Sequence, residues 1–237
     1  MKKMARLRDP LHAVEQRVVA CERCPELRAY CAAIARAPKA AYHDRPYWGK
    51  PVPAFGDPRA RLLLVGLAPG AHGSNRTGRP FTGDASGDFL YPALHRAGFA
   101  SQAQASRRDD GLQLHDCAIT AALHCAPPKN KPTPQQLRRC LPHLLDEFDA
   151  LTHVTVVVGL GRIGHEAILR MLRERDFLLT PARPPFAHGA QSVATRAERR
   201  IAILASYHPS RQNTNTGTLT MPMFDAIFRR ARELLGR

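Results

Sequence analysis

Four short runs of nearly continuous apolar residues stand out along the chain. They are rich in leucine or β-branched residues and cover residues 61–66, 117–123, 153–160 and 201–207. Apolar runs of this length without polar alternation are typical of strands that are covered on both faces, as in a parallel sheet. The pattern therefore predicts four buried, parallel strands.

Helical patterns with one apolar face follow these runs, at residues 86–98, 133–151, 162–175 and 223–237. Strands that alternate with helices predict an α/β fold, here a three-layer α/β/α sandwich around a parallel sheet of about four strands. We expect a single domain over residues 1–237, with an amino-terminal arm of about residues 1–58 before the first buried strand. Ligands of such sheets bind at the carboxyl ends of the strands, so the segments that follow the strands are the first candidates for a site.

The charge balance narrows the class of partner. Lys and Arg number 35 against 20 Asp and Glu, a formal net charge of +15, which favours a polyanion; a generally basic surface, as in a thermophile, is the other explanation. The charged start lacks the apolar core of a secretory signal, and no apolar run is long enough to span a bilayer. We therefore expect no membrane partner and a reducing, cytoplasmic setting, in which cysteines serve as thiols or metal ligands.

Three of the segments that follow strands carry candidate chemistry. Residues 66–84 are dense in glycine and small polar residues, so backbone N–H groups there can approach a ligand closely. Residues 208–217 begin with His208, which is either catalytic or structural, and the following proline favours an extended backbone for it. Residues 124–134 contain Asn130, whose amide can read a base or orient a water, or can simply form a turn.

The segment after the third strand is a formal dinucleotide-binding fingerprint, G-L-G-R-I-G at residues 159–164. That fingerprint also requires an acidic residue about 20 positions further on, at the end of the next strand. Residues 178–182 read L-L-T-P-A, and the nearest acid, Asp176, precedes the apolar stretch. NAD binding is therefore the weaker interpretation.

Four of the six cysteines have the spacing of a metal site. Cys21 and Cys24 form a C-x2-C pair, and Cys125 and Cys140 follow about a hundred residues later. Four thiolates can hold either a tetrahedral zinc ion or a [4Fe-4S] cluster, and the spacing does not distinguish the two. Of the remaining cysteines, Cys117 lies in an apolar strand and is typical of a core residue, whereas Cys31 lies near the first pair and could replace one of the four.

Residues 66–84, together with the preceding W-G-K-P-V-P-A-F-G-D-P and the segments 124–134 and 208–217, resemble the signatures of family-5 uracil-DNA glycosylases. The resemblance covers about residues 18–235 and implies a uracil-DNA glycosylase-like fold. It also implies a DNA-repair enzyme that hydrolyses the N-glycosidic bond of uracil in DNA and leaves an abasic site. Such an enzyme flips the nucleotide out of the duplex. Family-4 and family-5 members share the cysteine pattern, which implies a [4Fe-4S] cluster rather than zinc, and a monomer is our default expectation.

The resemblance also assigns roles within these segments. Asp84 is the acid that activates water, with a helix cap as its alternative role, and His208 donates to the departing base. Asn130 is a second-rank catalytic residue. Phe81 is a stacking platform for the base, or else core. The candidate base pocket comprises Gly66, Leu67, Ala68, Gly70, Phe81 and Ala121. The candidate DNA-binding loop comprises Ser210, Arg211, Gln212, Asn213 and Asn215.

Two positions depart from the better-known relatives. Ala68 stands where family-4 members usually carry an acid, and Ala121 stands where they usually carry the asparagine that reads uracil. A pocket without that asparagine demands uracil less strictly, so we expect other deaminated bases such as hypoxanthine to be accepted. Two alternatives remain: a non-catalytic member of the superfamily that recognises damaged bases, and an unrelated zinc- or iron-sulfur-bearing nucleic-acid binding module.

Overall fold

The computed structural model describes residues 10–236; residues 1–9 and 237, which the predicted domain and its amino-terminal arm include, lie outside the described residues. The strands are β1 (Phe55–Gly56), β2 (Leu62–Gly66), β3 (Cys117–Ala121), β4 (Val156–Leu160), β5 (Leu178–Thr180), β6 (Gln191–Arg196) and β7 (Arg199–Ser206). The α-helices are α2 (Pro10–Val19), α3 (Pro25–Arg36), α4 (Ser74–Thr77), α5 (Ala85–Arg96), α6 (Pro134–Ala150), α7 (Arg162–Arg173), α8 (Arg211–Asn215) and α9 (Met221–Leu234). Two 3₁₀ turns are η1 (Ala40–Tyr42) and η2 (Pro128–Asn130).

The sheet has the strand order β1-β3-β2-β4-β7-β6-β5, with the four predicted strands at its centre. Strands β3, β2, β4 and β7 pair in parallel, as the apolar runs predict. The sequence pattern did not predict β1, β5 and β6, which pair antiparallel at the two edges and make the whole sheet mixed. These edge strands are short or largely exposed, so they lack the continuous apolar run by which a buried strand is recognised.

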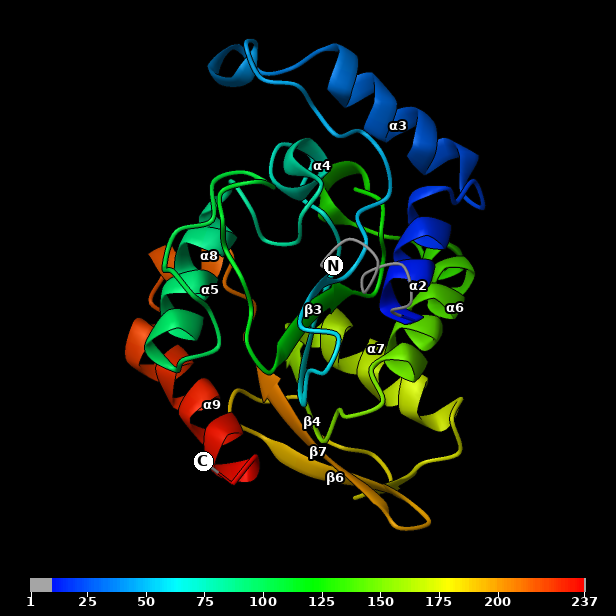
Figure 1. Cartoon of the computed structure of the whole chain (residues 1–237), viewed down its shortest axis with the longest axis vertical. Helices are drawn as coiled ribbons and strands as arrows, with labels where there is room; N and C mark the ends of the chain where they lie inside the picture. Colours follow the sequence, from blue (N-terminus) through cyan, green and yellow to red (C-terminus); the bar gives the residue numbers. More distant parts are fainter. Residues whose placement is uncertain (1–9, 237) are drawn as a thin grey trace, which may run out of the picture.

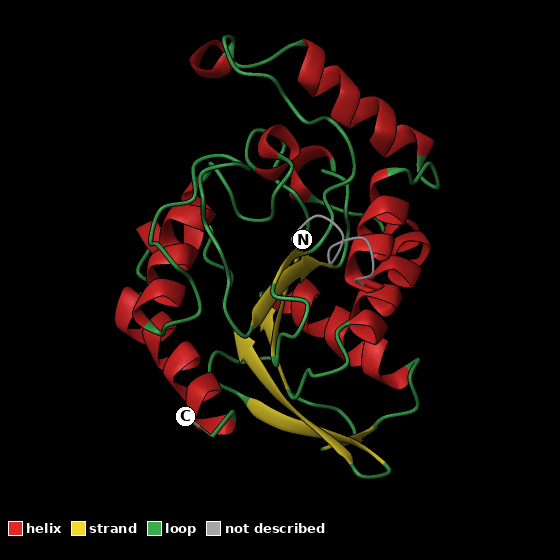
Figure 2. Ribbon diagram, in the orientation of Figure 1, coloured by secondary structure: helices red, strands yellow, loops and turns green. Residues whose placement is uncertain are grey.

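Helices cover both faces of the sheet, which gives the predicted three layers (Figures 1 and 2). Side chains alternate along each strand, so Leu62 and Leu64 of β2 pack towards α5 and α9. Leu63 and Val65 point to the opposite face and pack in the core formed with α6 and α7. No helix among residues 10–236 is long and apolar enough to cross a membrane.

The glycines of the G-L-G-R-I-G segment are explained by close packing between α7 and the sheet. A Cβ atom at Gly164 would lie 2.2 Å from the carbonyl oxygen of Val65, and one at Gly159 would lie 2.5 Å from the Cα of His165. Both positions therefore require glycine for steric reasons alone, without any cofactor. The helix they admit places Gly161 against His208, at the carboxyl end of β7.

Candidate active site and thiol cavity

The loop that joins β2 to α5 is held in shape by two buried arginines. The guanidinium of Arg76 donates to the carbonyl oxygens of His72 (2.8 Å) and Gly83 (2.9 Å), which ties the two halves of the loop together. Arg79 forms a bidentate ion pair with Asp110, at 2.8 and 2.7 Å. Burial alone would raise the pKa of Asp110, but Arg79 and three backbone N–H donors lower it to about 2. The loop is thus a rigid frame rather than a flexible glycine-rich link.

Asp84 ends this loop and caps helix α5 with one carboxylate oxygen. Its Oδ1 accepts from the backbone N–H of Ser86 and of Gly87, both at 3.1 Å. The second oxygen, Oδ2, lies against Gly73, where a Cβ atom would approach it to 1.9 Å. Burial raises the pKa of the Asp84 carboxyl, and the two N–H donors oppose that shift. The two roles that the sequence left as alternatives are therefore compatible, because the cap uses only one of the two oxygens.

Phe81 and His208 face each other across the strand ends. The Phe81 residue has a φ of 50°, and its ring lies directly over Gly66, where a Cβ atom would be 2.9 Å from Cζ. The ring centroids of Phe81 and His208 are 5.9 Å apart at an interplanar angle of 32°. Burial lowers the pKa of His208 to about 4, so its imidazole is neutral at physiological pH. A neutral imidazole can donate one hydrogen bond without carrying a charge into the pocket.

The other predicted pocket residues lie at the ends of β2 and β3. Backbone bonds from Ala122 to Gly66 (2.9 Å) and from Leu123 to Leu67 (3.1 Å) extend the pairing of these strands beyond their last residues. Four of the predicted pocket residues are half-buried at these strand ends: Leu67, Ala68, Gly70 and Ala121. Asn130 is exposed in η2 with a φ of 55°, the left-handed geometry of a turn.

The loop after His208 forms the short helix α8. Ser210 caps this helix by accepting from the backbone N–H of Asn213 at 3.4 Å. The Asn213 amide donates to the carbonyl oxygen of His208 at 2.9 Å, so this side chain holds the histidine in place. Arg211, Gln212 and Asn215 are exposed and remain available to a partner.

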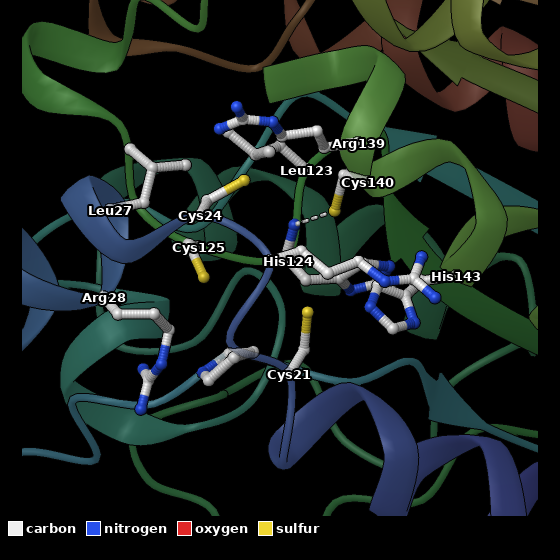
Figure 3. A pocket seen from close by; sticks show the side chains of 12 residues that line it. Cys21, Cys24, Leu27, Arg28, Leu123, His124, Cys125, Arg139, Cys140 and His143 are labelled. Carbon is white, nitrogen blue, oxygen red and sulfur yellow. Dashed lines mark hydrogen bonds between the residues drawn. The ribbon is translucent and has the colours of Figure 1, made fainter. Parts of the chain in front are cut away.

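The four predicted ligand cysteines surround one cavity, with their sulfur atoms turned towards its interior (Figure 3). Cys21 and Cys24 come from the connection between α2 and α3, Cys125 from the segment after β3, and Cys140 from helix α6. The backbone N–H of His124 donates to the Cys140 sulfur at 3.3 Å. Cys31 lies beside the cavity, fully buried and hydrogen-bonded to Cys125, while Cys117 lies in the core as predicted. All six cysteines are free thiols.

No group of three or more His, Cys, Asp and Glu side chains among the described residues is arranged to hold a single metal ion. Burial raises the pKa of Cys140 to about 12, and the hydrogen bond with Cys31 together with burial raises the pKa of Cys125. These two thiols are therefore uncharged at neutral pH.

Sequence reasoning did not find a buried polar network between this cavity and the sheet. Glu147 of α6 accepts from the backbone N–H of Ala54 at 3.0 Å and hydrogen-bonds to the hydroxyl of Thr120. Its Oε2 lies 3.6 Å from Nε2 of His124, the residue next to Cys125. Burial raises the pKa of Glu147 to about 8. The only sequence signal was a glutamate on the apolar face of a predicted helix.

Comparison with known proteins identifies relatives over nearly the whole chain. The family model of the Uracil DNA glycosylase superfamily matches residues 53–232. The Type-5 uracil-DNA glycosylase of Thermus thermophilus is 50% identical over 224 residues, which cover 94% of this chain and 98% of the relative. The Type-5 uracil-DNA glycosylase of Mycobacterium bovis is 45% identical over 91% of this chain and 78% of its own length. A Type-4 uracil-DNA glycosylase of Sulfurisphaera tokodaii is 26% identical over 95% of this chain and 85% of its own length.

Proposed function

Because this chain belongs to the uracil DNA glycosylase superfamily, we propose that it is a DNA-repair hydrolase that cleaves the N-glycosidic bond of uracil in DNA and leaves an abasic site. One observation carries this proposal: a carboxylate that uses only one of its oxygens in a helix cap and a neutral imidazole both lie at the carboxyl ends of the strands. Asp84 keeps one oxygen beyond its helix cap, and His208 is half-buried and uncharged. A non-catalytic binding protein has no need for both groups.

The two groups suit the two halves of glycosidic hydrolysis. As the bond breaks, the sugar becomes cationic and the base departs as an anion. The Asp84 carboxylate can accept a proton from the attacking water or stabilise the cationic sugar, and its raised pKa strengthens it as a base. The His208 imidazole can donate to the base oxygen on which negative charge develops. Phe81 offers its ring, over Gly66, as the surface on which the extruded base stacks.

The direct test is single-turnover cleavage of a uracil-containing oligonucleotide, read as alkali-sensitive abasic sites. Wild-type protein is expected to produce them. Asp84→Asn keeps the helix cap, because Asn and Asp cap about equally well, but it removes the charge. The cleavage rate should therefore fall steeply while DNA binding is retained. Normal cleavage by Asp84→Asn would show that the residue acts only as a cap, and binding without cleavage by the wild type would favour the non-catalytic alternative.

We further propose that the pocket accepts other deaminated bases, including hypoxanthine. Ala68 and Ala121 are half-buried at the pocket and offer no side-chain hydrogen bond with which to demand uracil. Rejection of a wrong base is weak where no buried polar group is left unpaired by it. A comparison of single-turnover rates on uracil and hypoxanthine substrates tests this. A rate on hypoxanthine more than about 10⁴-fold lower than the rate on uracil would contradict the proposal, because rejection of that strength requires a buried polar group that hydrogen-bonds to the correct base.

DNA binding through the exposed residues of α8 is also a proposal. Arg211, Gln212 and Asn215 project from a helix directly after His208, so contact there would bring the duplex to the pocket. Arg211→Ala should weaken binding to all DNA sequences alike, because contacts to phosphates carry little information about the bases. A loss confined to uracil-containing DNA would contradict this role.

We propose that Cys21, Cys24, Cys125 and Cys140 hold a [4Fe-4S] cluster. Four free thiols that line one cavity, with their sulfur atoms turned inward, support this. When bound, such a group supplies a structural cross-link, because glycosidic hydrolysis transfers no electrons. The cysteines would then fasten α3 to α6 and to the loop after β3. Colourless protein with one zinc per chain would contradict the proposal.

A further inference from the structure

The segment between α3 and β1 carries positive charge that the catalytic residues do not use. Residues 36–50 contain four exposed cations and one acid, Asp44. The cations are Arg36, Lys39, Arg45 and Lys50. None of them takes part in an ion pair within the described part of the chain. Their charge is therefore available to an outside partner. We call residues 36–50 the basic segment.

The aromatic residues of the basic segment fasten it to the catalytic loop. The ring of Tyr42 stacks under the guanidinium of Arg76, 4.2 Å from its centroid. The Tyr47 hydroxyl hydrogen-bonds to Nδ1 of His72 at 3.0 Å, and the backbone N–H of Trp48 donates to the Arg76 carbonyl at 2.8 Å. Each of these partners belongs to the loop that ends in Asp84. The segment is therefore held against the loop that carries the catalytic carboxylate.

The same contacts fix the end of the parallel strands at which the basic segment lies. The loop after β2 lies at the carboxyl edge of the parallel strands, where His208 also lies. In Figure 1 the chain around η1 loops out beyond α4, away from the sheet. Two of the cations are steadied by aromatic rings, with Arg45 at 5.9 Å from the Tyr42 centroid and Lys50 at 5.8 Å from the Trp48 centroid. Cations held in advance lose less conformational freedom when they bind an anion.

We propose that the basic segment is a second DNA-binding element, whose cations contact backbone phosphates of the duplex that the active site engages. The identity of the polyanion rests on the proposed function, whereas the location of the contact rests on the geometry above. The segment belongs to a different part of the chain from α8, so the duplex would be gripped from two elements. Phosphate contacts of this kind position the DNA without reading its sequence.

The test compares two double variants that remove the same amount of charge, one near the carboxyl ends of the parallel strands and one near their amino ends. Lys39→Ala with Arg45→Ala removes two cations from the basic segment. Arg59→Ala with Arg200→Ala removes two exposed cations next to the amino ends of β2 and β7. Binding to a fluorescein-labelled, undamaged DNA duplex is followed by anisotropy over a series of salt concentrations, and the unfolding temperature of each variant confirms that it is folded.

The Lys39/Arg45 variant should bind on the order of tenfold more weakly, and the slope of log K against log salt should decrease in magnitude by about 1.8, or 0.9 for each lost phosphate contact. The Arg59/Arg200 variant should keep the wild-type slope. Equal losses in both variants would mean that only net charge matters, and an unchanged slope in the first would remove the segment from the interface; either result overturns the inference. If wild-type protein bound DNA as expected but did not cleave uracil, the proposed function would fail while the inference stood.

Discussion

Replacing Gly73 by alanine should displace the carboxylate of Asp84 by steric contact, without changing any atom of Asp84 itself. The φ of Gly73 is −100°, outside the left-handed region that favours glycine, so the Cβ atom that alanine adds is the change of interest. Its Cβ atom, however, would lie 1.9 Å from Oδ2 of Asp84 and 2.6 Å from Cγ, whereas ordinary contacts begin at 3.4 Å. The carboxylate or the loop must therefore move by 1.5 Å, the difference between those two distances.

The carboxylate cannot retreat freely, because its other oxygen holds two backbone N–H groups of α5. Movement would either break the cap, at a cost of about 1 kcal/mol, or displace the oxygen that we propose activates the attacking water. A displacement of about 1 Å at a reacting group lowers rates by roughly a hundredfold. We expect a single-turnover cleavage rate lower by about that factor, with DNA affinity close to that of the wild type.

Gly70→Ala is the matched control, since its Cβ atom would approach the same oxygen only to 3.3 Å. A shift of a few tenths of an ångström accommodates that contact, so this variant should cleave within a fewfold of the wild-type rate. Single-turnover rates on the same uracil oligonucleotide, together with the unfolding temperatures of both variants, complete the comparison. Equal rates for the two variants would refute the argument that Gly73 provides the space for Asp84.

Other predictions concern His208, the thiol cavity and Glu147. His208→Ala should slow cleavage about a hundredfold, and less for bases that leave easily; because its pKa is lowered to about 4, the wild-type pH–rate profile should show no histidine step near pH 6.5. Cys140→Ser should lose iron and the absorbance near about 400 nm, whereas Cys117→Ala should keep both; equal iron in the two variants would move the site. Burial raises the pKa of Glu147 to about 8 from 4.5, so its contribution to stability is complete below pH 4.5 and is lost as pH rises towards 8. Between pH 5 and 8, the free energy of unfolding in urea should fall less with rising pH in Glu147→Gln than in the wild type, by up to about 1.4 kcal/mol per pH unit. Identical pH profiles for the two proteins would contradict a protonated Glu147 in the folded state.

Buried strands and signature loops could be predicted because each leaves a local mark in the sequence. Leu62–Gly66 is an unbroken apolar run, and the loop from Gly66 to Asp84 is dense in glycine. The edge strand β5 leaves no such mark, since Leu178 and Thr180 are exposed. Its place in the sheet is fixed by pairing with β6, a contact between residues that the local pattern does not connect.

The framework around the candidate groups could not be predicted from the sequence. Arg76 and Arg79 look like surface cations in sequence, yet both are buried and hydrogen-bonded to the loop. The need for glycine at Gly73 arises from a carboxylate eleven residues further along the chain. Asn213 was assigned to DNA from its position, while its amide is engaged by the His208 backbone. Each of these facts depends on tertiary contacts, which residue type and spacing do not specify.

The helix cap and the proposed catalytic role of Asp84 together limit how this protein can evolve. Most substitutions at this position would remove the cap as well as the charge that we propose for catalysis, so a lineage that no longer needed the chemistry would still be selected against losing the residue. Only exchanges to other capping residues, asparagine foremost, separate the two effects. An inactive but stable descendant that had kept its DNA-binding surface would therefore be expected to pass through asparagine at position 84, and an aspartate there can persist for reasons of folding long after selection for catalysis has ended.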